Sequence, residues 1–473
     1  MMKKTSYVLI LSFSLILNAL LTSAAVRLPS IIGSHMVLQQ QSEVKLWGWC
    51  APAEKVTVKT SWDTITYKTI GSSSAKWSLK IKTPAAGGPY TLTINGSTIL
   101  EDVMIGEVWL CSGQSNMEWS GDQGIKQSLD EMPHANNQKI RLFYVSKATS
   151  EYPQENCAGS WKVCSPEEMK HFSSIGYFFG KDLQQAMNIP VGLINSNWGG
   201  TPAETWTPKN EVESDPQLSN AAKKIEPTDW WPTLPGDAYN AMIYPLANFE
   251  ISGVIWYQGE TNVPTYSTYK QLLTRMISAW RESWKKEFPF YYVQIAPFSG
   301  YGEHDFCALQ RETMTKCLSI PKTGMVVISD LVEDIKNIHP VDKIGVADRL
   351  ANLALSETYG KSGLNYRFPL YKGMKNEKNK IRILFDYADH GLMCKGKTIT
   401  EIYIAGADRQ FLPAMAKIDG NTLIVWNKSI KAPVAVRFGF TNTAIPNLFS
   451  KEGLPVNLFR TDNWEVDTVP VKK

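Results

Sequence analysis

Short segments that alternate apolar and polar residues dominate the chain directly after residue 25. They occupy residues 44–49, 55–58 and 90–94, and glycines and prolines separate them. Alternation with a period of two is the pattern of strands that bury one face, and Asn95-Gly96 is a hairpin signal. We therefore expect a small β-sandwich domain over residues 26–104.

From residue 105 to about residue 362, strand-like apolar runs alternate with helical periods. Apolar residues recur every three or four positions over residues 269–284 and 344–354, which predicts two amphipathic helices. Such alternation favours an α/β fold, in which helices cover both faces of a mostly parallel sheet. The runs that we expect to form its strands lie at residues 108–111, 191–194, 254–257, 291–295 and 325–328.

The last part of the chain, residues 363–473, returns to a β-rich pattern. Residues 381–385, 402–404 and 423–426 are strand candidates, and Asp419-Gly420-Asn421 is a hairpin signal before the third of them. We see no internal repeat. The predicted order along the chain is therefore a β domain, an α/β domain and a second β region.

The first 25 residues have the layout of a secretory signal peptide. Lys3 and Lys4 precede an apolar run over residues 7–21, and the small residues Ala24 and Ala25 suit cleavage. The run is shorter than the roughly 20 residues that a membrane span needs, although an uncleaved anchor is the alternative. We expect export to the periplasm or the extracellular space, without stable membrane insertion of the mature chain.

Charge and cysteine content exclude several functional classes. The 49 Lys and Arg against 45 Asp and Glu form no basic block, so nothing indicates a nucleic acid partner. In an exported protein the seven Cys permit disulfides, and the pairs Cys157–Cys164 and Cys307–Cys317 are candidates that leave at least one thiol free. The six His form no close cluster, so we expect neither a metal nor another cofactor.

Polar residues follow four of the predicted parallel strands. Because ligands bind at the carboxyl ends of such strands, these side chains are expected at one site. They supply a hydroxyl that a base can activate, backbone N–H groups and an amide for an oxyanion, an acid, and an imidazole. The residues are Ser115, Gly199 and Gly200, Glu260 and Asn262, and His339.

All of these residues except Glu260 also have an ordinary structural interpretation. Ser115 can be a helix cap, Gly199-Gly200 a tight turn, Asn262 an Asx turn before Pro264, and His339 a structural histidine. Their occurrence together at consecutive sheet ends favours the catalytic interpretation.

Three motifs resemble the sialate O-acetylesterase family, a branch of the SGNH hydrolases: residues 113–117, residues 258–262 and Ile338-His339-Pro340. The resemblance implies a flavodoxin-like catalytic domain with flanking β domains that removes acetyl groups from sugar hydroxyls without a metal. It implies Ser115 as nucleophile and His339 as base. The implied oxyanion hole combines the N–H of Ser115, an N–H of Gly199 or Gly200, and the side chain of Asn262.

One position departs from the family pattern. Many SGNH enzymes carry Asp three residues before the His, where this chain has Lys336, which cannot accept the imidazole N–H. Glu260, Asp330 and Asp334 are the candidates for the orienting acid, and a Ser115–His339 dyad is the alternative. We favour Glu260, because the end of the neighbouring strand places it near the site.

The function we expect is that of an exported carbohydrate O-acetylesterase acting on O-acetylated sialic acid, with kcat/KM rising through an apparent pKa within about two units of 6.5. An acetylesterase for xylan or another polysaccharide is one alternative. A carbohydrate-binding protein without catalysis is another, because tryptophans near the motifs can stack on sugars. These are Trp119, Trp198, Trp206, Trp230 and Trp231.

Overall fold

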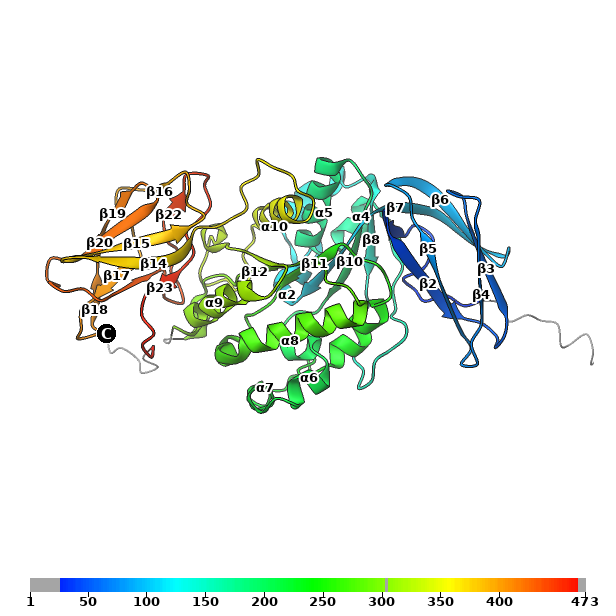
Figure 1. Cartoon of the computed structure of the whole chain (residues 1–473), viewed down its shortest axis with the longest axis horizontal. Helices are drawn as coiled ribbons and strands as arrows, with labels where there is room; N and C mark the ends of the chain where they lie inside the picture. Colours follow the sequence, from blue (N-terminus) through cyan, green and yellow to red (C-terminus); the bar gives the residue numbers. More distant parts are fainter. Residues whose placement is uncertain (1–25, 303–304, 467–473) are drawn as a thin grey trace, which may run out of the picture.

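The computed structural model describes residues 26–302 and 305–466. Three parts follow one another along the longest axis of the molecule: an N-terminal β region, a central α/β region, and a C-terminal β region at the opposite end (Figure 1). This order agrees with the expected one. The expected signal peptide, residues 1–25, lies outside the described residues.

The N-terminal region consists of short strands, which pair antiparallel except for β1, a parallel partner of β7. The predicted runs at residues 44–49, 55–58 and 90–94 fall in β2, β3 and β6, whereas β1, β4 and β5 were not predicted. Strand β2 pairs with β5, while β3 pairs with both β4 and β6. The hairpin after β6 turns at Asn95 and Gly96, whose φ angles of 51° and 70° suit this pair of residues. The strands are β1 (Val37–Gln39), β2 (Glu43–Trp49), β3 (Lys55–Thr60), β4 (Thr66–Ile70), β5 (Lys76–Lys82) and β6 (Gly87–Ile94).

Strand β7 (Thr98–Gly113) joins this region to the central one. Its first half pairs antiparallel with β6, and its second half pairs in parallel with β10 and β11 of the central sheet. The expected boundary between residues 104 and 105 therefore falls inside one continuous strand. The two regions also share one hydrophobic core.

The central sheet has the strand order β13-β12-β11-β7-β10-β8-β9, parallel throughout except for β9 at one edge. Without β8 and β9, which our sequence interpretation did not include, the remaining strands follow the flavodoxin-like order 2-1-3-4-5. The strands besides β7 are β8 (Asn137–Tyr144), β9 (Trp161–Cys164), β10 (Val191–Asn197), β11 (Gly253–Tyr257), β12 (Phe290–Val293) and β13 (Thr323–Val326).

Helices cover both faces of this sheet. Helices α5 (Ser174–Met187) and α10 (Lys343–Glu357) pack together on one face, and α8 (Tyr266–Trp284) lies on the other (Figure 1). Within the described residues, no helix has the length and apolar character needed to cross a bilayer. The other α-helices among the described residues are α2 (Ser115–Glu118), α3 (Lys126–Glu131), α4 (Pro166–Lys170), α6 (Lys209–Glu213), α7 (Pro216–Ala222) and α9 (Phe306–Lys316).

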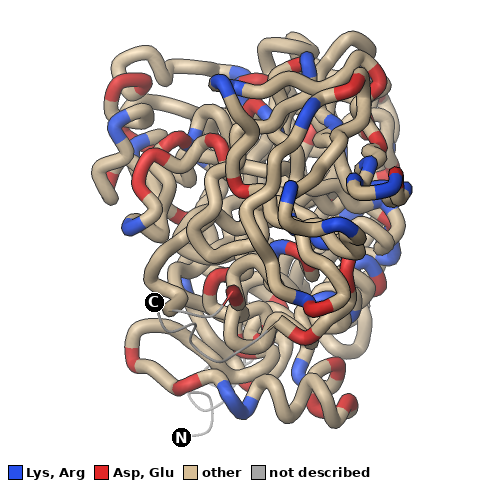
Figure 2. Tube along the Cα trace, turned by 90° about the vertical axis from the view of Figure 1, so that its left-hand side faces the viewer, with Lys and Arg blue, Asp and Glu red and all other residues tan. Residues whose placement is uncertain are grey.

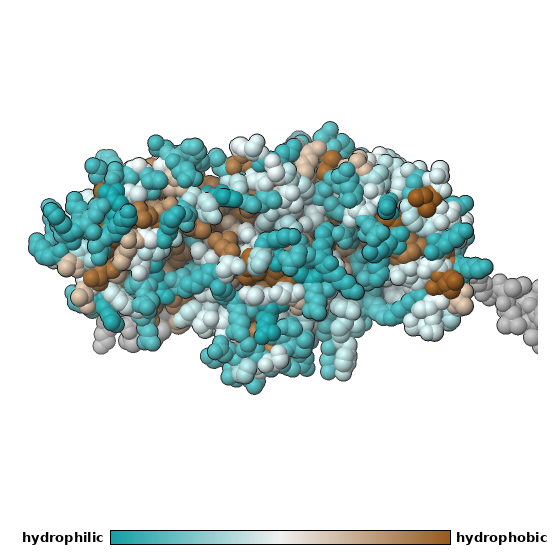
Figure 3. All heavy atoms as spheres, in the orientation of Figure 1, coloured by the Kyte–Doolittle hydropathy of each residue, from teal (hydrophilic) through white to brown (hydrophobic). Residues whose placement is uncertain are grey.

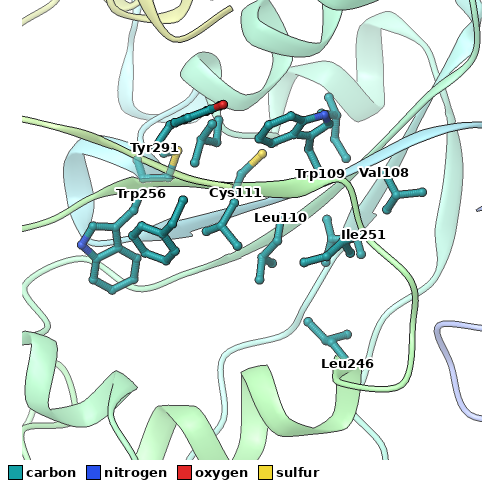
Figure 4. Close-up of a cluster of buried hydrophobic side chains, with 14 of the residues drawn as sticks. Val108, Trp109, Leu110, Cys111, Leu246, Ile251, Trp256 and Tyr291 are labelled. Atoms are coloured by element: carbon teal, nitrogen blue, oxygen red, sulfur yellow. The ribbon is translucent and has the colours of Figure 1, made fainter. Parts of the chain in front are cut away.

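The second half of β7 is buried on both faces, as its continuous apolar run predicts. Trp109 and Cys111 project to the side of Tyr291, and Leu110 projects to the opposite side (Figure 4). Trp109 stacks on Tyr291 with ring centroids 5.9 Å apart. This packing fixes the position of β7, which ends two residues before the candidate nucleophile.

The C-terminal region forms small antiparallel sheets around a core of its own. The predicted hairpin is present, because Gly420 with a φ of 64° turns the chain between β19 and β20. The strands are β14 (Leu370–Glu377), β15 (Lys380–Asp386), β16 (Leu392–Cys394), β17 (Ile402–Ala405), β18 (Phe411–Pro413), β19 (Met415–Asp419), β20 (Thr422–Trp426), β21 (Ala435–Phe438), β22 (Leu448–Ser450) and β23 (Phe459–Arg460).

Charges of both signs are interspersed in the view onto the C-terminal end of the molecule (Figure 2). On the face seen in Figure 3, apolar residues appear as separate spots among hydrophilic ones. All seven cysteines are free thiols, so neither Cys157–Cys164 nor Cys307–Cys317 forms the disulfide that we had considered. These four are buried, so each behaves as a small apolar core residue.

Candidate active site

Ser115 lies where β7 ends against β11. Gly113 has a φ of +136°, and a Cβ on it would lie 2.1 Å from the carbonyl oxygen of Tyr257, so only glycine fits there. The N–H of Gln114 then donates to that same carbonyl at 2.9 Å. The chain is thereby fixed just before Ser115, which is half-buried and opens helix α2.

His339 reaches Ser115 from the loop between β13 and α10. Its Nε2 lies 2.9 Å from Oγ of Ser115, although 224 positions separate the two residues in the sequence. The backbone N–H of His339 donates to Oδ1 of Asn337 at 2.9 Å, which shapes the loop locally. The structure therefore brings together the hydroxyl and the imidazole in the geometry that general-base activation requires.

The indole of Trp119 stacks on the imidazole. The ring centroids of Trp119 and His339 are 3.8 Å apart and the rings are inclined by 24°. Burial, and secondarily the charge of Lys343, lower the pKa of His339 to about 4. This is below the range that we expected from the ordinary value of 6.5, so the imidazole is neutral over a wider range of pH.

The three candidate acids make other hydrogen bonds. Asp330 forms a two-point ion pair with Arg349, with both N···O distances 2.7 Å, and Asp334 accepts the N–H of Lys336. Glu260 accepts a hydrogen bond of 2.7 Å from Nδ2 of Asn116. Among the described residues, no carboxylate is bonded to the Nδ1 of His339, so the structure does not bring Glu260 into direct contact with the imidazole.

Two backbone donors near Ser115 are unoccupied. No acceptor among the described residues takes the N–H of Ser115 or of Gly200. Gly199 lies against the nucleophile, because a Cβ on it would be 3.3 Å from that of Ser115, but its own N–H donates to Glu118. The loop can thus offer N–H groups to an oxyanion, of which those of Ser115 and Gly200 are free.

Asn262 is hydrogen-bonded on both ends of its amide. Its Oδ1 accepts from the N–H of Ala203 at 2.9 Å and from Gln258 at 2.7 Å. Its Nδ2 donates to Glu204 at 2.8 Å and to Thr265 at 3.3 Å. Asn262 therefore connects the loop after β11 to the loop after β10, and neither amide hydrogen is free for a ligand.

Three supporting residues were not recognised in the sequence. Asn116 follows the candidate nucleophile, and Lys343 lies four residues after His339, so their proximity to the motifs was a usable signal. The buried Glu204 gave no such signal. Burial raises the pKa of Glu204 to about 7, with the hydrogen bond from Asn262 opposing the shift.

The tryptophans considered for sugar stacking have different environments. Trp206 is fully buried, Trp119 covers the imidazole, and the ring of Trp231 packs against Gly200. Trp198 lies beneath the ammonium of Lys147, 5.6 Å from its ring centroid. Trp230 is 80% exposed, which leaves its faces accessible to a sugar.

Comparison with known proteins identifies similar chains. Residues 105–355 match the family described as "Carbohydrate esterase, sialic acid-specific acetylesterase". The sialate O-acetylesterase of Mus musculus is 28% identical, over 88% of this chain and 89% of its own. The human sialate O-acetylesterase is 30% identical, over 73% of both chains.

A solved structure resembles nearly the whole chain. It is a carbohydrate acetylesterase from Xanthomonas citri, which is 35% identical, has a TM-score of 0.85, and covers 93% of this chain and 100% of its own. The similarity extends beyond the α/β region, so the flanking β regions are part of the shared architecture.

Proposed function

Because the chain belongs to the sialic acid-specific acetylesterase family of carbohydrate esterases, we propose that it removes acetyl groups from O-acetylated sialic acid by serine catalysis. The hydrogen-bond distance of 2.9 Å between Ser115 and His339 carries this proposal. The strand order of the central sheet and the serine directly after its central strand support the assignment of this region to the SGNH hydrolase fold.

The proposed reaction proceeds through an acetyl-enzyme. Oγ of Ser115 attacks the acetyl carbonyl while Nε2 of His339 takes the hydroxyl proton. The tetrahedral intermediate collapses when His339 returns that proton to the departing sugar oxygen. Water, deprotonated by His339, then attacks the acetyl group. His339 gives this proton to Oγ of Ser115 as the bond to the acetyl carbon breaks and acetate is released. The lowered pKa of His339 keeps the imidazole neutral, the form in which it accepts a proton.

The oxyanion would receive its hydrogen bonds from the N–H groups of Ser115 and Gly200, which have no acceptor among the described residues. Gly199 and Asn262 also belong to the proposed oxyanion hole, but their donors are already in use. The backbone N–H of Gly199 donates to Glu118, and Nδ2 of Asn262 donates to Glu204. These hydrogen bonds have to break before either group can bind the oxyanion. Two free donors are sufficient for stabilisation of the usual kind.

A broader polysaccharide substrate is the second candidate. The Xanthomonas citri enzyme, whose description specifies only a carbohydrate, is 35% identical to this chain, against 28% and 30% for the mouse and human sialate O-acetylesterases. Acetylated xylan represents this class. Either substrate suits the export that the first 25 residues predict, to the periplasm or the extracellular space.

Acetate release from a panel of acetylated sialic acids and acetylated xylan tests the proposal, with Ser115→Ala as the inactive control. Preferential release from sialic acid is the expected result. Preferential release from xylan would replace the sialic acid assignment with the second candidate. Binding of these sugars without any release would instead identify a carbohydrate-binding protein that has lost catalysis.

A further inference from the structure

The side chain of Asn116 is fully buried and contacts three other segments. Its Nδ2 donates to Oε1 of Glu260 at 2.7 Å and to the backbone carbonyl of Ile338 at 3.0 Å. Its Oδ1 accepts from Nζ of Lys343 at 2.9 Å. The ends of β7 and β11, the loop between β13 and α10, and the start of α10 therefore meet at one amide.

The chemistry of these partners fixes the orientation of the amide. Lys343 can only donate, so it requires the oxygen of Asn116. A carbonyl cannot donate, so Ile338 requires the nitrogen. All hydrogen-bonding groups of the amide thus have a suitable partner, as a buried polar group needs.

Burial makes this arrangement sensitive to change. Lys343 is 1% exposed and Glu260 is 5% exposed. Burial lowers the pKa of Lys343 to about 7, which Glu260 and Asp342 oppose, and burial raises the pKa of Glu260 to about 7, which Lys343 opposes. Each residue therefore stabilises the ionised form of the other across Asn116.

The network adjoins both reacting side chains. Asn116 directly follows Ser115, and the Ile338 carbonyl that it binds directly precedes His339. A displacement of Asn116 changes the distance between Oγ and Nε2, and errors near 1 Å in such contacts can cost about 10²-fold in rate. We propose that Glu260, Asn116 and Lys343 are positioning residues that hold Ser115 and His339 together, an inference that rests on the proposed serine mechanism.

The isosteric variant Asn116→Asp tests the centre of the network. It removes both N–H donors and places a carboxylate beside Glu260. We expect kcat to fall by about 10²-fold with KM within about threefold, because substrate-binding groups are untouched. Asn240→Asp is the matched control, since the buried Asn240 also donates to two carbonyls, of Ser150 and Glu151, both at 3.0 Å. The control should lose thermal stability and keep kcat.

Variants of Lys343 provide a readout that structural damage alone would not give. Lys343→Met removes a positive charge that lowers the pKa of His339, so the acidic limb of kcat/KM should move to higher pH. The charged groups around this ammonium are Glu260 from the end of β11 and Asp342 at the start of α10. Lys343→Gln keeps a donor for Asn116, so it should recover part of the kcat lost in Lys343→Met while showing the same shift.

A fluorophosphonate that labels activated serines separates this inference from the choice of substrate. If wild-type protein is labelled at Ser115 but releases no acetate, the proposed substrate is wrong and the labelling rates of the variants still test the network. The inference is overturned if Asn116→Asp keeps kcat, or the labelling rate, within about fivefold of wild type, or if Asn240→Asp loses as much. If Asn116→Asp does not fold, Lys343→Gln provides the test instead. The inference is then overturned if Lys343→Gln has the wild-type kcat and the acidic limb of its kcat/KM profile does not move.

Discussion

Two buried carboxyl groups near the site, those of Glu260 and Glu204, support different parts of it. Glu260 is 5% exposed and Glu204 is 1% exposed, and burial raises the pKa of each to about 7. Each accepts a hydrogen bond from an asparagine, Glu260 from Asn116 at 2.7 Å and Glu204 from Asn262 at 2.8 Å. The remaining partners of the asparagines differ. Asn116 binds the ammonium of Lys343, whereas Asn262 binds only uncharged groups.

This difference separates positioning of the reacting groups from shaping of the loop. The Glu260 network adjoins Ser115 and His339 and carries charge. Around Glu204, neutral hydrogen bonds connect the loops after β10 and β11, including that from Thr261 to the carbonyl of Gly200 at 2.9 Å. Damage to the first should therefore appear in kcat, and damage to the second should also appear in KM.

Among variants of residues other than Ser115, the largest effect should come from His339→Ala, which removes the proposed base next to the Glu260 network. We expect kcat to fall by roughly 10⁴-fold or more, as for a residue that acts as a unit with its serine. Acetate release from the preferred substrate measures the loss. The control is His171→Ala, because the exposed His171 is bonded to Asp122. Activity within tenfold of wild type in His339→Ala would contradict the proposed role.

Asn262→Ala tests the hydrogen-bond network around Glu204. It frees the N–H of Ala203 and leaves Glu204 without its amide donor, so the loop carrying Gly199 and Gly200 should lose its position. We expect kcat to fall by about 10–10²-fold and KM to rise, because both the oxyanion donors and the rim of the site shift. Steady-state kinetics of Asn262→Ala and Asn116→Asp, measured side by side, decide the comparison. If Asn262→Ala changed kcat alone, the Glu260 and Glu204 networks would not differ in their effects.

A smaller effect is expected from Trp119→Leu. The indole stacked at 3.8 Å orients the imidazole and faces the imidazolium that forms when His339 takes a proton. Such contacts contribute about 1–2 kcal/mol, so kcat should fall by roughly tenfold. Trp119→Phe, which keeps an aromatic face, should recover most of the loss. Equal activities for Leu and Phe would show that the ring face does not matter.

A further prediction concerns stability and not rate. Because the pKa of Glu204 in the folded protein is raised to about 7, its contribution to stability is present below its unfolded value near 4.3 and is lost as pH rises through 7. Glu204→Gln keeps an acceptor for Asn262 without this ionisation. It should raise the free energy of unfolding by up to about 3 kcal/mol at pH 8 and have little effect at pH 4.5. Thermal melts at both values measure this, and equal shifts would contradict it.

The sequence predicted the parts of the fold that local patterns encode. The apolar run at residues 108–111 identified the central strand, but polar residues such as Glu101 and Asp102 hid its continuation into the N-terminal region. The rule that ligands bind at the carboxyl ends of parallel strands placed Ser115 and His339 at one edge of the sheet, although it could not predict their hydrogen bond. It also placed Glu260 near the site, but the role for which it favoured Glu260, the acid that orients the imidazole, is not what the hydrogen bond from Asn116 shows. It could not show that Asn116 intervenes, because this depends on Lys343 being buried against the same amide.

The proposed role of Ser115 as the nucleophile underlies every prediction about reaction rate, and Ser115→Ala tests it most directly. The substitution removes one oxygen from a half-buried side chain, so the fold should be retained, as circular dichroism and thermal melting can verify. We predict that kcat for acetate release falls by roughly 10³–10⁶-fold. A folded Ser115→Ala protein that keeps more than about a tenth of the wild-type kcat would contradict the account.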